Sequence, residues 1–550
     1  MLALLADPAA AKSGDPQPSQ SIFGNYLAAR HAQIERKTRA AAELYLAALK
    51  KDPENPDLLV RTFGLLASDG RFDQALPLAR KLSKTTGRRA ELANLVLAME
   101  QIKKGNFKSV KETLDGLPAT GINLFVLPLL NAWTLVGLKD VEAALALLKK
   151  GSSNSGIAVL NGLHAGLIEA HAGRQAAAEK RFRALAKKRQ IPDLRLTHYL
   201  GTLLERAGKP GEARAVYKKY LERRPDTTML DDALARLKRG HRPGVFLASV
   251  RNGMAEAFFS LAGATRRQGP DETMLFVRLA LYLRPDFQIA RLLLAETLES
   301  DNRLEDAIAA YESVDGESHF SWTARLRIAG NLDQMGKTGK AVAMLGKMAD
   351  ERPARYDALV SLGDIQRRHE RYREAAKAYT RTKERLTKIE ARHWTLFYSS
   401  GIAFERLKEW PKAEVDFLKA LDLQPDHPSV LNYLGYSWVE LGRNLKRARK
   451  MIEKAVARRP RDGYIVDSLG WVLHRLGDLK GAVKQLERAV ELRPEDPTIN
   501  DHLGDVYWKA KRRTEARFQW QRALTLEPNK EDIPKINKKL KQGLPEKRKP

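Results

Sequence analysis

The sequence contains no cysteine among its 550 residues. This absence excludes disulfides, thiolate metal sites, cysteine nucleophiles and a lipid anchor attached to cysteine. It does not fix the compartment, because a helical protein needs no disulfide in any compartment. Runs of about eighteen apolar residues are also absent, so no segment is predicted to span a membrane.

Acidic residues are fewer than basic ones: 67 Asp and Glu stand against 96 Lys and Arg, a formal net charge of +29. A field of this sign attracts nucleic acid, anionic lipid or acidic proteins. The basic residues recur along the whole chain, with local enrichment only in the last twenty positions. This distribution favours a generally basic, solvated surface.

Residues that favour strands are sparse as well, whereas Ala, Leu, Arg, Lys and Glu dominate, which favours helices. Apolar residues make up 43% of the chain, as in an ordinary folded protein. The chain is too long for one compact core. The composition therefore predicts a helical protein that is divided into several units.

An internal repeat organises the C-terminal third of the chain. Four prolines and four glycines mark it: Pro425, Pro460, Pro494, Pro528, Gly401, Gly435, Gly470 and Gly504. Both series recur every 34 or 35 residues, the period of a pair of short helices. The glycine suits a close approach of the two helices of a pair, and the proline ends the second helix.

These positions resemble the tetratricopeptide repeat (TPR) family, whose units follow W-x2-L-G-x2-Y, then A-x3-F-x2-A and a closing proline. Weaker copies continue upstream, with one clear copy at Gly201, Ala213, Tyr217 and Pro225. The resemblance implies an all-α fold, a right-handed superhelical α-solenoid of about thirteen TPR helix pairs.

The register divides the chain into five predicted segments. They are a disordered leader or remnant of an export signal at 1–20, an N-terminal TPR array at 21–227, a junction at 228–253, a C-terminal TPR array at 254–530 with its best-kept repeats at 394–530, and a capping helix with a basic tail at 531–550. The junction is inferred from a phase break that includes KRGHRPGVF, a stretch that no repeat accounts for.

The first residues leave two locations open. The apolar run from Leu2 to Ala6 is too short for the core of a signal peptide, but a small-residue run at Ala9, Ala10 and Ala11 is typical of a cleavage site. We interpret this segment as the end of an export signal that begins further upstream. The chain is then periplasmic or in the cell envelope; without such a signal it is cytoplasmic.

No complete catalytic, cofactor or metal motif is present in the sequence. The stretch from Gly330 to Lys340 has one residue too many for a phosphate-binding loop and follows no strand. In GYSWV, Val439 stands where a nucleophile elbow needs glycine. His164 and His171 are seven residues apart without a third ligand. We therefore predict no enzyme activity, no cofactor and no metal site.

The resemblance also implies where a partner binds, because the first helix of each TPR pair lines a concave groove that receives peptides. Carried onto this register, the C-terminal groove contains Tyr398, Asn432, Tyr436, Asp467, Trp471, His474, Arg475, Asp501, Asp505, Trp508 and Lys509. Exposed aromatic and polar groups of this kind form protein-binding hot spots. The alternative is that Trp471 and Trp508 only pack between neighbouring repeats.

The run from Leu431 to Leu524 is similar to the C-terminal part of a group of proteobacterial TPR proteins. More distantly, it resembles an envelope TPR lipoprotein that acts as adaptor for a C-terminal-processing protease. The leading hypothesis is a non-enzymatic scaffold or adaptor for an unidentified protein or peptide partner. The alternative is a helical-repeat binder of RNA or another polyanion, which rests on the net charge and on aromatics beside Arg and Lys in the groove.

Overall fold

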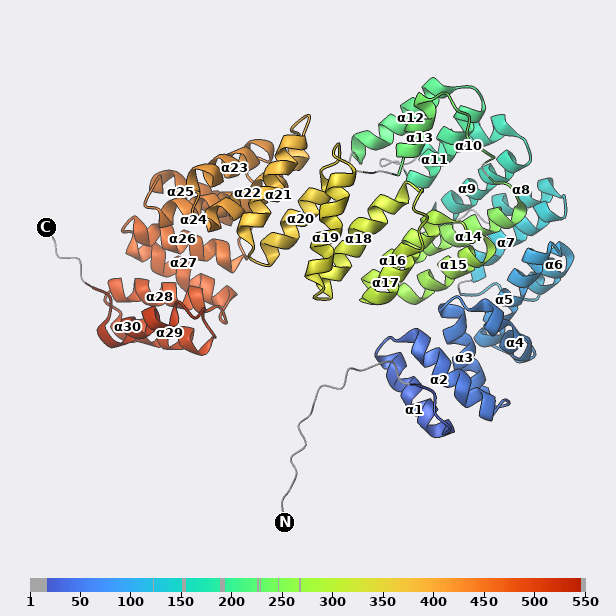
Figure 1. Cartoon of the computed structure of the whole chain (residues 1–550), viewed down its shortest axis with the longest axis horizontal. Coiled ribbons are helices and arrows are strands. Elements are labelled where there is room, and N and C mark those ends of the chain that lie inside the picture. Colours follow the sequence, from blue (N-terminus) through green and yellow to red (C-terminus); the bar gives the residue numbers. More distant parts are fainter. Residues whose placement is uncertain are drawn as a thin grey trace, which may run out of the picture. The chain divides into compact units, whose positions relative to one another are not determined.

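The computed structural model describes residues 17–121, 123–150, 155–187, 193–224, 227, 229–245, 247–266 and 269–545 (Figure 1). Most of the predicted leader, the end of the predicted basic tail and Pro225 of the predicted repeat lie outside these residues. Within them the chain is all α-helix, with no strand. The all-α solenoid predicted from the repeat is confirmed.

The described residues form two compact units, which divide between Lys337 and Thr338. The helices of the first unit are α1 (Ile22–Ile34), α2 (Thr38–Lys51), α3 (Pro56–Ser68), α4 (Phe72–Leu82), α5 (Arg88–Lys104), α6 (Phe107–Asp115), α7 (Asn123–Gly137), α8 (Val141–Lys150), α9 (Ser155–His171), α10 (Gln175–Lys187), α11 (Leu194–Arg206), α12 (Pro210–Arg223), α13 (Asp231–Lys238), α14 (Val250–Thr265), α15 (Pro270–Leu283), α16 (Gln288–Ser300), α17 (Leu304–Glu312) and α18 (Phe320–Gln334).

The second unit continues the helix pairs in sequence order and is closed by one last helix. Its helices are α19 (Thr338–Glu351), α20 (Asp357–Arg368), α21 (Tyr372–Arg385), the short 3₁₀ helix η1 (Ala391–His393), α22 (Trp394–Arg406), α23 (Trp410–Leu423), α24 (Pro428–Glu440), α25 (Leu445–Arg458), α26 (Gly463–Arg475), α27 (Leu479–Leu492), α28 (Pro497–Lys509), α29 (Arg513–Thr525) and α30 (Ile533–Gln542).

The repeated prolines explain where the second helices of the pairs end. The residue before a proline is pushed out of the helical region. Gln424 and Arg459, the C-caps of α23 and α25, accordingly have φ of −134° and −132° with positive ψ, and each is followed by proline. The register of prolines therefore fixes the length of these helices.

The repeated glycines are places where the two helices of a pair touch. A Cβ at Gly401 would lie 2.7 Å from the ring of Phe417, and one at Gly470 would lie 2.5 Å from Leu486 Cγ. Gly201 faces Tyr217 in the same way in the first unit. A larger residue would push the axes apart, so glycine sets the spacing of each pair.

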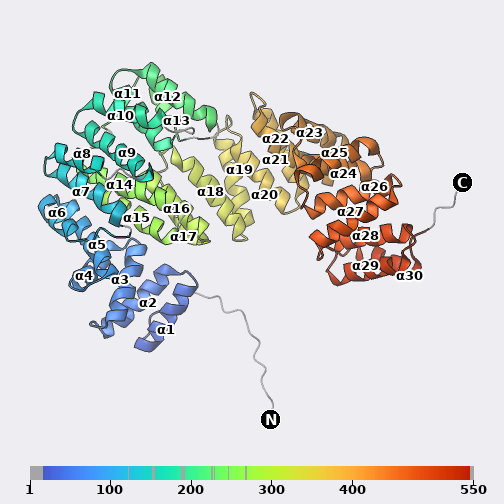
Figure 2. The ribbon, with the colours of Figure 1, turned by 180° about the vertical axis from the view of Figure 1, so that it is seen from behind.

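In the first unit the chain folds back onto its own repeats. After α12, the single helix α13 and the segment that follows it return the chain, and α14 packs on α7 and α9 while α15 packs on α3 and α5. Figures 1 and 2 show α14 to α17 along the inner side of the row formed by α1 to α12. All four contacted helices are the first helices of their pairs, so the groove of this array is filled by the same chain.

The predicted junction at 228–253 coincides with this return of the chain, whereas the division into compact units falls later, after Lys337. The phase break falls where the single helix α13 stands between the pair α11 and α12 and the pair α14 and α15. The segment boundaries drawn from the sequence remain predictions.

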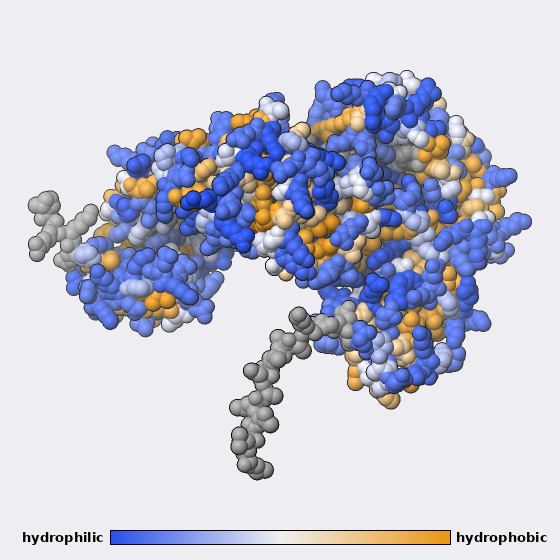
Figure 3. Space-filling view, viewed as in Figure 1, coloured by the Kyte–Doolittle hydropathy of each residue, from blue (hydrophilic) through white to orange (hydrophobic). Residues whose placement is uncertain are grey.

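Polar residues dominate the surface of both units on the face that Figure 3 shows, and apolar residues appear there only in smaller patches. This pattern follows from the helices, which bury one apolar stripe each and turn their charged residues outward. The high content of Lys and Arg is therefore accommodated on the surface, as the sequence indicates.

Candidate functional site

The residues predicted to form a groove all lie on first helices of pairs in the second unit. Tyr398 is on α22; Asn432 and Tyr436 are on α24; Asp467, Trp471, His474 and Arg475 are on α26; Asp501, Asp505, Trp508 and Lys509 are on α28. Most of them fall into three groups: residues that line an open cavity, residues of a buried polar network, and residues covered by α30. Whether they contact a partner stays a prediction.

A cavity of about 480 Å³ lies between α22, α24, α26 and α28. It is lined by Asn432, Tyr436 and Asp467 of the predicted set, and at its edge Tyr464 and Leu441 are 51% and 46% exposed. The cavity is therefore continuous with solvent and offers aromatic and aliphatic surface to a binding partner.

Charged groups of both signs surround this cavity. Glu405, Glu440 and Asp467 contribute carboxylates, and Arg406 and Lys408 contribute cations at the end nearest α22. The hydroxyl of Tyr433 donates to Glu405 Oε2 at 3.2 Å, which holds that carboxylate against the wall. The lining therefore carries charges of both signs, as expected for a surface that binds polar groups of a partner.

Two polar atoms in the lining have no hydrogen-bond partner among the residues that the structure describes. They are Asn432 Oδ1 and Trp410 Nε1, and both are buried. A buried polar group without a partner costs roughly 1–3 kcal/mol, so native proteins seldom retain one without a reason. One of these atoms accepts and the other donates, which suits an amide group.

Asp467 belongs to a polar network that joins three successive repeats and is buried at Asp467 and His502. Its carboxylate lies 2.9 Å from His502 Nδ1, and the ring of His502 stacks on Trp471 with centroids 4.2 Å apart. Trp471 Nε1 in turn donates to Glu440 Oε1 at 2.6 Å. Asp467 and Trp471 are thereby held in fixed positions beside the cavity.

The two histidines beside Trp471 carry different charges. Burial would lower the pKa of His502, but the carboxylate of Asp467, supported by Asp501 and Asp505, outweighs it and raises this pKa to about 8. Burial, together with Lys509 and Arg475, lowers the pKa of His474 to about 4. At neutral pH His502 is therefore charged and His474 is neutral.

The predicted residues of α28 are covered by the end of the chain. Lys539 Nζ on α30 lies 2.7 Å from Asp501 and 2.8 Å from Asp505. Trp508 Nε1 and Lys509 Nζ donate to the main-chain carbonyls of residues 544 and 545. These four side chains therefore contact α30 or the residues that follow it.

Two predicted residues lie away from the cavity. Tyr398 packs among Trp394, Phe417 and Tyr433, with ring centroids 6.0–6.2 Å apart. Arg475 is exposed at the end of α26. Neither belongs to the cavity lining.

Sequence reasoning missed most residues of this lining, among them Glu405, Glu440, Tyr464 and His502. One signal for His502 was available, because it lies 35 residues after Asp467 and so occupies nearly the same place in the next repeat. No signal marked the glutamates, since charged residues are common at the ends of these helices.

The corresponding face of the first unit is closed by its own chain. A Cβ at Gly253 on α14 would lie 2.4 Å from the ring of Trp133 on α7, and Trp133 Nε1 donates to His164 Nδ1 at 3.1 Å. On α11, Tyr199 donates to the buried carboxylate of Glu256, which also pairs with Arg195. These contacts fix α14 against the array.

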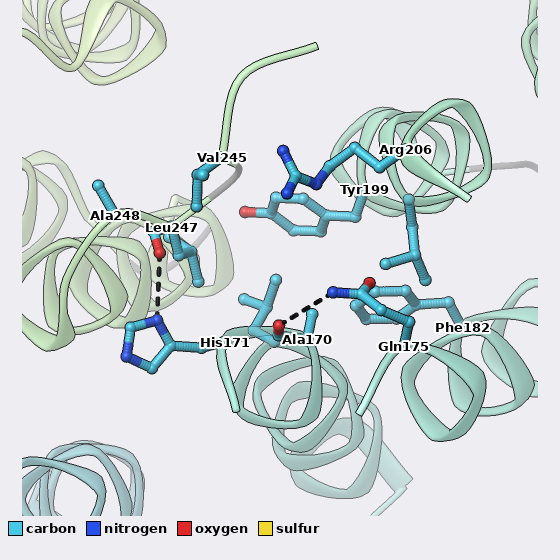
Figure 4. Close-up of a pocket in the computed structure, with 11 residues that line it drawn as sticks. Ala170, His171, Gln175, Phe182, Tyr199, Arg206, Val245, Leu247 and Ala248 are labelled. Carbon is cyan, nitrogen blue, oxygen red and sulfur yellow. Dashed lines mark hydrogen bonds between the residues drawn. The ribbon is translucent and has the colours of Figure 1, made fainter. Parts of the chain in front are cut away.

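A small pocket remains where the returning stretch crosses α9 and α11 (Figure 4). Its volume is about 180 Å³. His171 lies 3.1 Å from the carbonyl of Leu247, and Arg206 donates to the carbonyl of Pro243 at 3.3 Å. Groove side chains of this array thus bind main-chain carbonyls of the same protein.

Metal ligands do not gather anywhere in the part of the chain that the structure describes, which contains no cluster of three or more potential ligands. His164, one of the two histidines considered as ligands, is buried against Trp133. Over the same described residues no helix is both long and apolar enough to cross a bilayer.

Known families match much of the chain. The family model described as tetratricopeptide repeat matches residues 26–87, 163–227, 326–388 and 368–428, and a model described as TPR repeat matches residues 470–511. A TPR repeat-containing protein of Pseudomonas aeruginosa is 32% identical over 84 residues, which are 15% of this chain and 14% of that protein. The chain thus aligns with only a small part of this curated relative.

Solved structures of repeat proteins are also similar to parts of the chain. MamA from Desulfovibrio magneticus is 22% identical, with a TM-score of 0.28, over 31% of this chain and 94% of that one. The APC/C hetero-tetramer Cut9-Hcn1 is 14% identical, with a TM-score of 0.38, over 96% of this chain and 97% of that one.

The family matches and the paired helices together define the class of this chain. It is a tetratricopeptide repeat protein that resembles proteobacterial TPR proteins. Repeats of this family form protein-interaction scaffolds, and this coarse function applies here.

Proposed function

We propose that the chain is a non-catalytic adaptor that binds a segment of another protein in the cavity between α22 and α28. One observation carries this proposal: the second unit keeps an open cavity with an exposed aromatic residue, Tyr464, whereas the equivalent face of the first unit is filled by α14 and α15. A preformed cavity on a rigid array binds a segment without large ordering costs in the scaffold.

The chemistry of the lining supports a peptide as the bound segment. Tyr436 and Tyr464 supply large contact area with few rotatable bonds, as binding hot spots do. A peptide amide offers both a donor and an acceptor, which are the groups that Asn432 Oδ1 and Trp410 Nε1 lack among the described residues.

Site-specific photo-crosslinking in living cells tests the proposal. A photo-reactive phenylalanine analogue replaces Tyr464 at the cavity in one strain and Phe518 on α29 in another. Both residues are exposed aromatics of the second unit, at 51% and 65%. We expect one discrete cross-linked protein from position 464 and none of that mass from position 518.

The variant Tyr436→Ala completes this experiment. Tyr436 lines the same cavity, so its loss should weaken cross-linking from position 464 at least several-fold while the helical circular dichroism spectrum is unchanged. Equal cross-linking from positions 464 and 518, or full cross-linking in the variant, would count against the cavity.

We further propose that this adaptor acts in the cell envelope. The support is the small-residue run after a short apolar stretch at the start of the sequence. Fractionation of the native organism tests it, with the expected outcome that the chain is released with the periplasmic fraction. Recovery in the cytoplasmic fraction alone would refute the location without affecting the adaptor role.

A further inference from the structure

The helix α25 carries an unusual density of basic residues for this protein. Its fourteen residues, Leu445–Arg458, contain six Lys or Arg and one Glu. The equivalent helices of the neighbouring repeats are far less basic: α23 contains two Lys against three acids, and α27 contains three Lys or Arg against two Glu. The excess of positive charge on α25 is therefore larger than on the second helices of the two repeats beside it.

Packing turns these cations outward. Ala448, Met451, Ile452 and Ala455 form the buried stripe of α25, whereas every Lys and Arg of the helix is exposed. Lys446, Lys450 and Lys454 recur four residues apart, so they form a row along the outer face with neighbours about 6 Å apart. We call this row, together with Arg447 and Arg458 beside it, the basic face of α25.

Only part of this charge is neutralised. Lys454 and Arg458 share the carboxylate of Asp426, at 2.6 and 3.7 Å. Lys446, Arg447 and Lys450 form no ion pair with any carboxylate in the residues that the structure describes. Arg447 lies 5.0 Å from the ring of the buried Trp438, which positions its guanidinium without cancelling its charge.

The surroundings of the row restrict what can bind it. α25 contains no aromatic residue, so bases of a single strand have nothing on this helix to stack on. Its large apolar residues are all buried or half-buried, so none is free to insert into a bilayer. What remains is a rigid line of cations, which matches the regularly spaced phosphates of a nucleic acid duplex.

We propose that the basic face of α25 binds the phosphate backbone of double-stranded nucleic acid without reading its sequence, which applies if the chain lies in the cytoplasm, the alternative to the envelope location. This surface lies on a second helix of a pair and is distinct from the cavity, whose carboxylates Glu405, Glu440 and Asp467 would repel phosphate. The proposal thus assigns polyanion binding, which the sequence analysis placed in the groove, to the outer face of α25.

Charge reversal on two matched helices tests this inference in the full-length protein. One variant is Lys446→Glu with Lys450→Glu, and the control is Lys480→Glu with Lys484→Glu on α27. Both pairs are exposed, four residues apart and equal in charge change. Fluorescence anisotropy measures binding of a DNA duplex of about twenty base pairs as salt rises from about 50 to about 200 mM.

The α25 variant should bind the duplex at least tenfold more weakly, and the slope of log affinity against log salt should fall by about two, near 0.9 for each lost phosphate contact. The α27 control should keep most of the salt dependence that the unmodified protein shows. The neutral variant Lys446→Gln with Lys450→Gln should reproduce the loss if contact rather than repulsion is responsible.

Three outcomes would overturn the proposal. They are an equal loss in the α25 and α27 variants, no duplex binding by the unmodified protein at the low salt, and binding to phosphatidylserine vesicles or polyglutamate that depends on the same lysines as strongly as duplex binding does. The last outcome would assign the basic face to a membrane surface or to an acidic protein.

Discussion

At the scale of single residues, glycine determines how closely the helices of a pair approach. Gly470 has no room for a methyl group, because Leu486 would lie 2.5 Å from its Cβ. A Cβ at Gly346, on α19 of the same unit, would meet no neighbouring atom of the described chain within 4 Å. The two glycines are in helices of similar length, so they form a matched pair.

Replacing these glycines by alanine should therefore act in opposite directions. Gly470→Ala should destabilise the second unit by about 1–3 kcal/mol because the helix pair is overpacked. Gly346→Ala should stabilise it by up to about 1 kcal/mol, the helix preference of alanine over glycine. Urea denaturation followed by tryptophan fluorescence measures both, and a neutral Gly470→Ala would contradict the packing argument.

The pair of Asp467 and His502 predicts a dependence on pH. The pKa of His502 is about 8 in the folded chain and 6.5 in the unfolded chain. Its stabilisation is thus complete below pH 6.5 and is lost as the pH rises through 8, about 2 kcal/mol in total. Comparing melting temperatures at pH 6.5 and pH 9 measures this loss.

The variant Asp467→Asn is the control for that measurement. Without the carboxylate, burial dominates and the pKa of His502 should fall below 6.5, which proton NMR of the imidazole detects. The variant should then lose no stability between pH 6.5 and pH 9 from this source. An unchanged pKa of His502 would show that another group holds its charge.

The sequence predicts single residues well where the repeat imposes them. Gly201, Gly401 and Gly470 contact the large side chains of their paired helices, as their register indicates. The pairing of His502 is harder to predict, because a histidine two residues before the consensus glycine carries no signal until Asp467 is placed opposite it. The consensus positions of the repeat predict which residues pack together. They do not predict ion pairs, because these depend on which side chain of the neighbouring repeat lies opposite.

At the scale of helices, the last one changes how the predicted groove is understood. Asp501 and Asp505 form ion pairs with Lys539 of α30, and Trp508 is covered by the residues that follow α30. The register predicts these side chains on the first helix of the last pair, and they do lie on that helix. The sequence predicts a capping helix within 531–550, but the register does not indicate that Lys539 of this helix would pair with Asp501 and Asp505.

Removing the charge of Lys539 should be costly for this reason. Lys539→Met leaves two partly buried carboxylates close together, and the expected loss is about 3 kcal/mol. Lys535→Met, on the same helix, breaks only an exposed pair with Asp532 and should change the stability little.

Hydrogen exchange of the amides in α28 and α29 measures this loss locally. Faster exchange in the Lys539 variant and unchanged exchange in the Lys535 variant are expected. Similar exchange in both variants would show that α30 is held by its apolar residues, such as Ile536, rather than by its charge.

At the scale of the whole chain, the two compact units differ in what occupies the groove of their helical array. The first array encloses α14 and α15, and the second keeps a cavity. This difference could not be predicted from the sequence, because Trp133 and Gly253 are 120 residues apart and belong to different repeats. The phase break showed only that the register is interrupted, not where the chain goes next.

Disturbing the first unit should therefore leave binding in the second unit intact. Gly253→Val places a branched side chain against the ring of Trp133 and should displace α14. Trypsin should then cleave faster after Lys238 and Arg239, while cross-linking from position 464 stays at the level of the unmodified protein. Unchanged proteolysis would contradict the packing of α14, and lost cross-linking would contradict the independence of the cavity.

The returning helices also set an order of events during synthesis. Chains emerge from the ribosome with the N-terminus first, so α7 and α9 are complete long before α14 exists. During that interval the part of the Trp133 ring that lies against Gly253 has no neighbour from α14. The nascent chain thus exposes an apolar surface on the first array until residue 265 has been added. The first array reaches its final form only when α14 has been synthesised and packs into the groove.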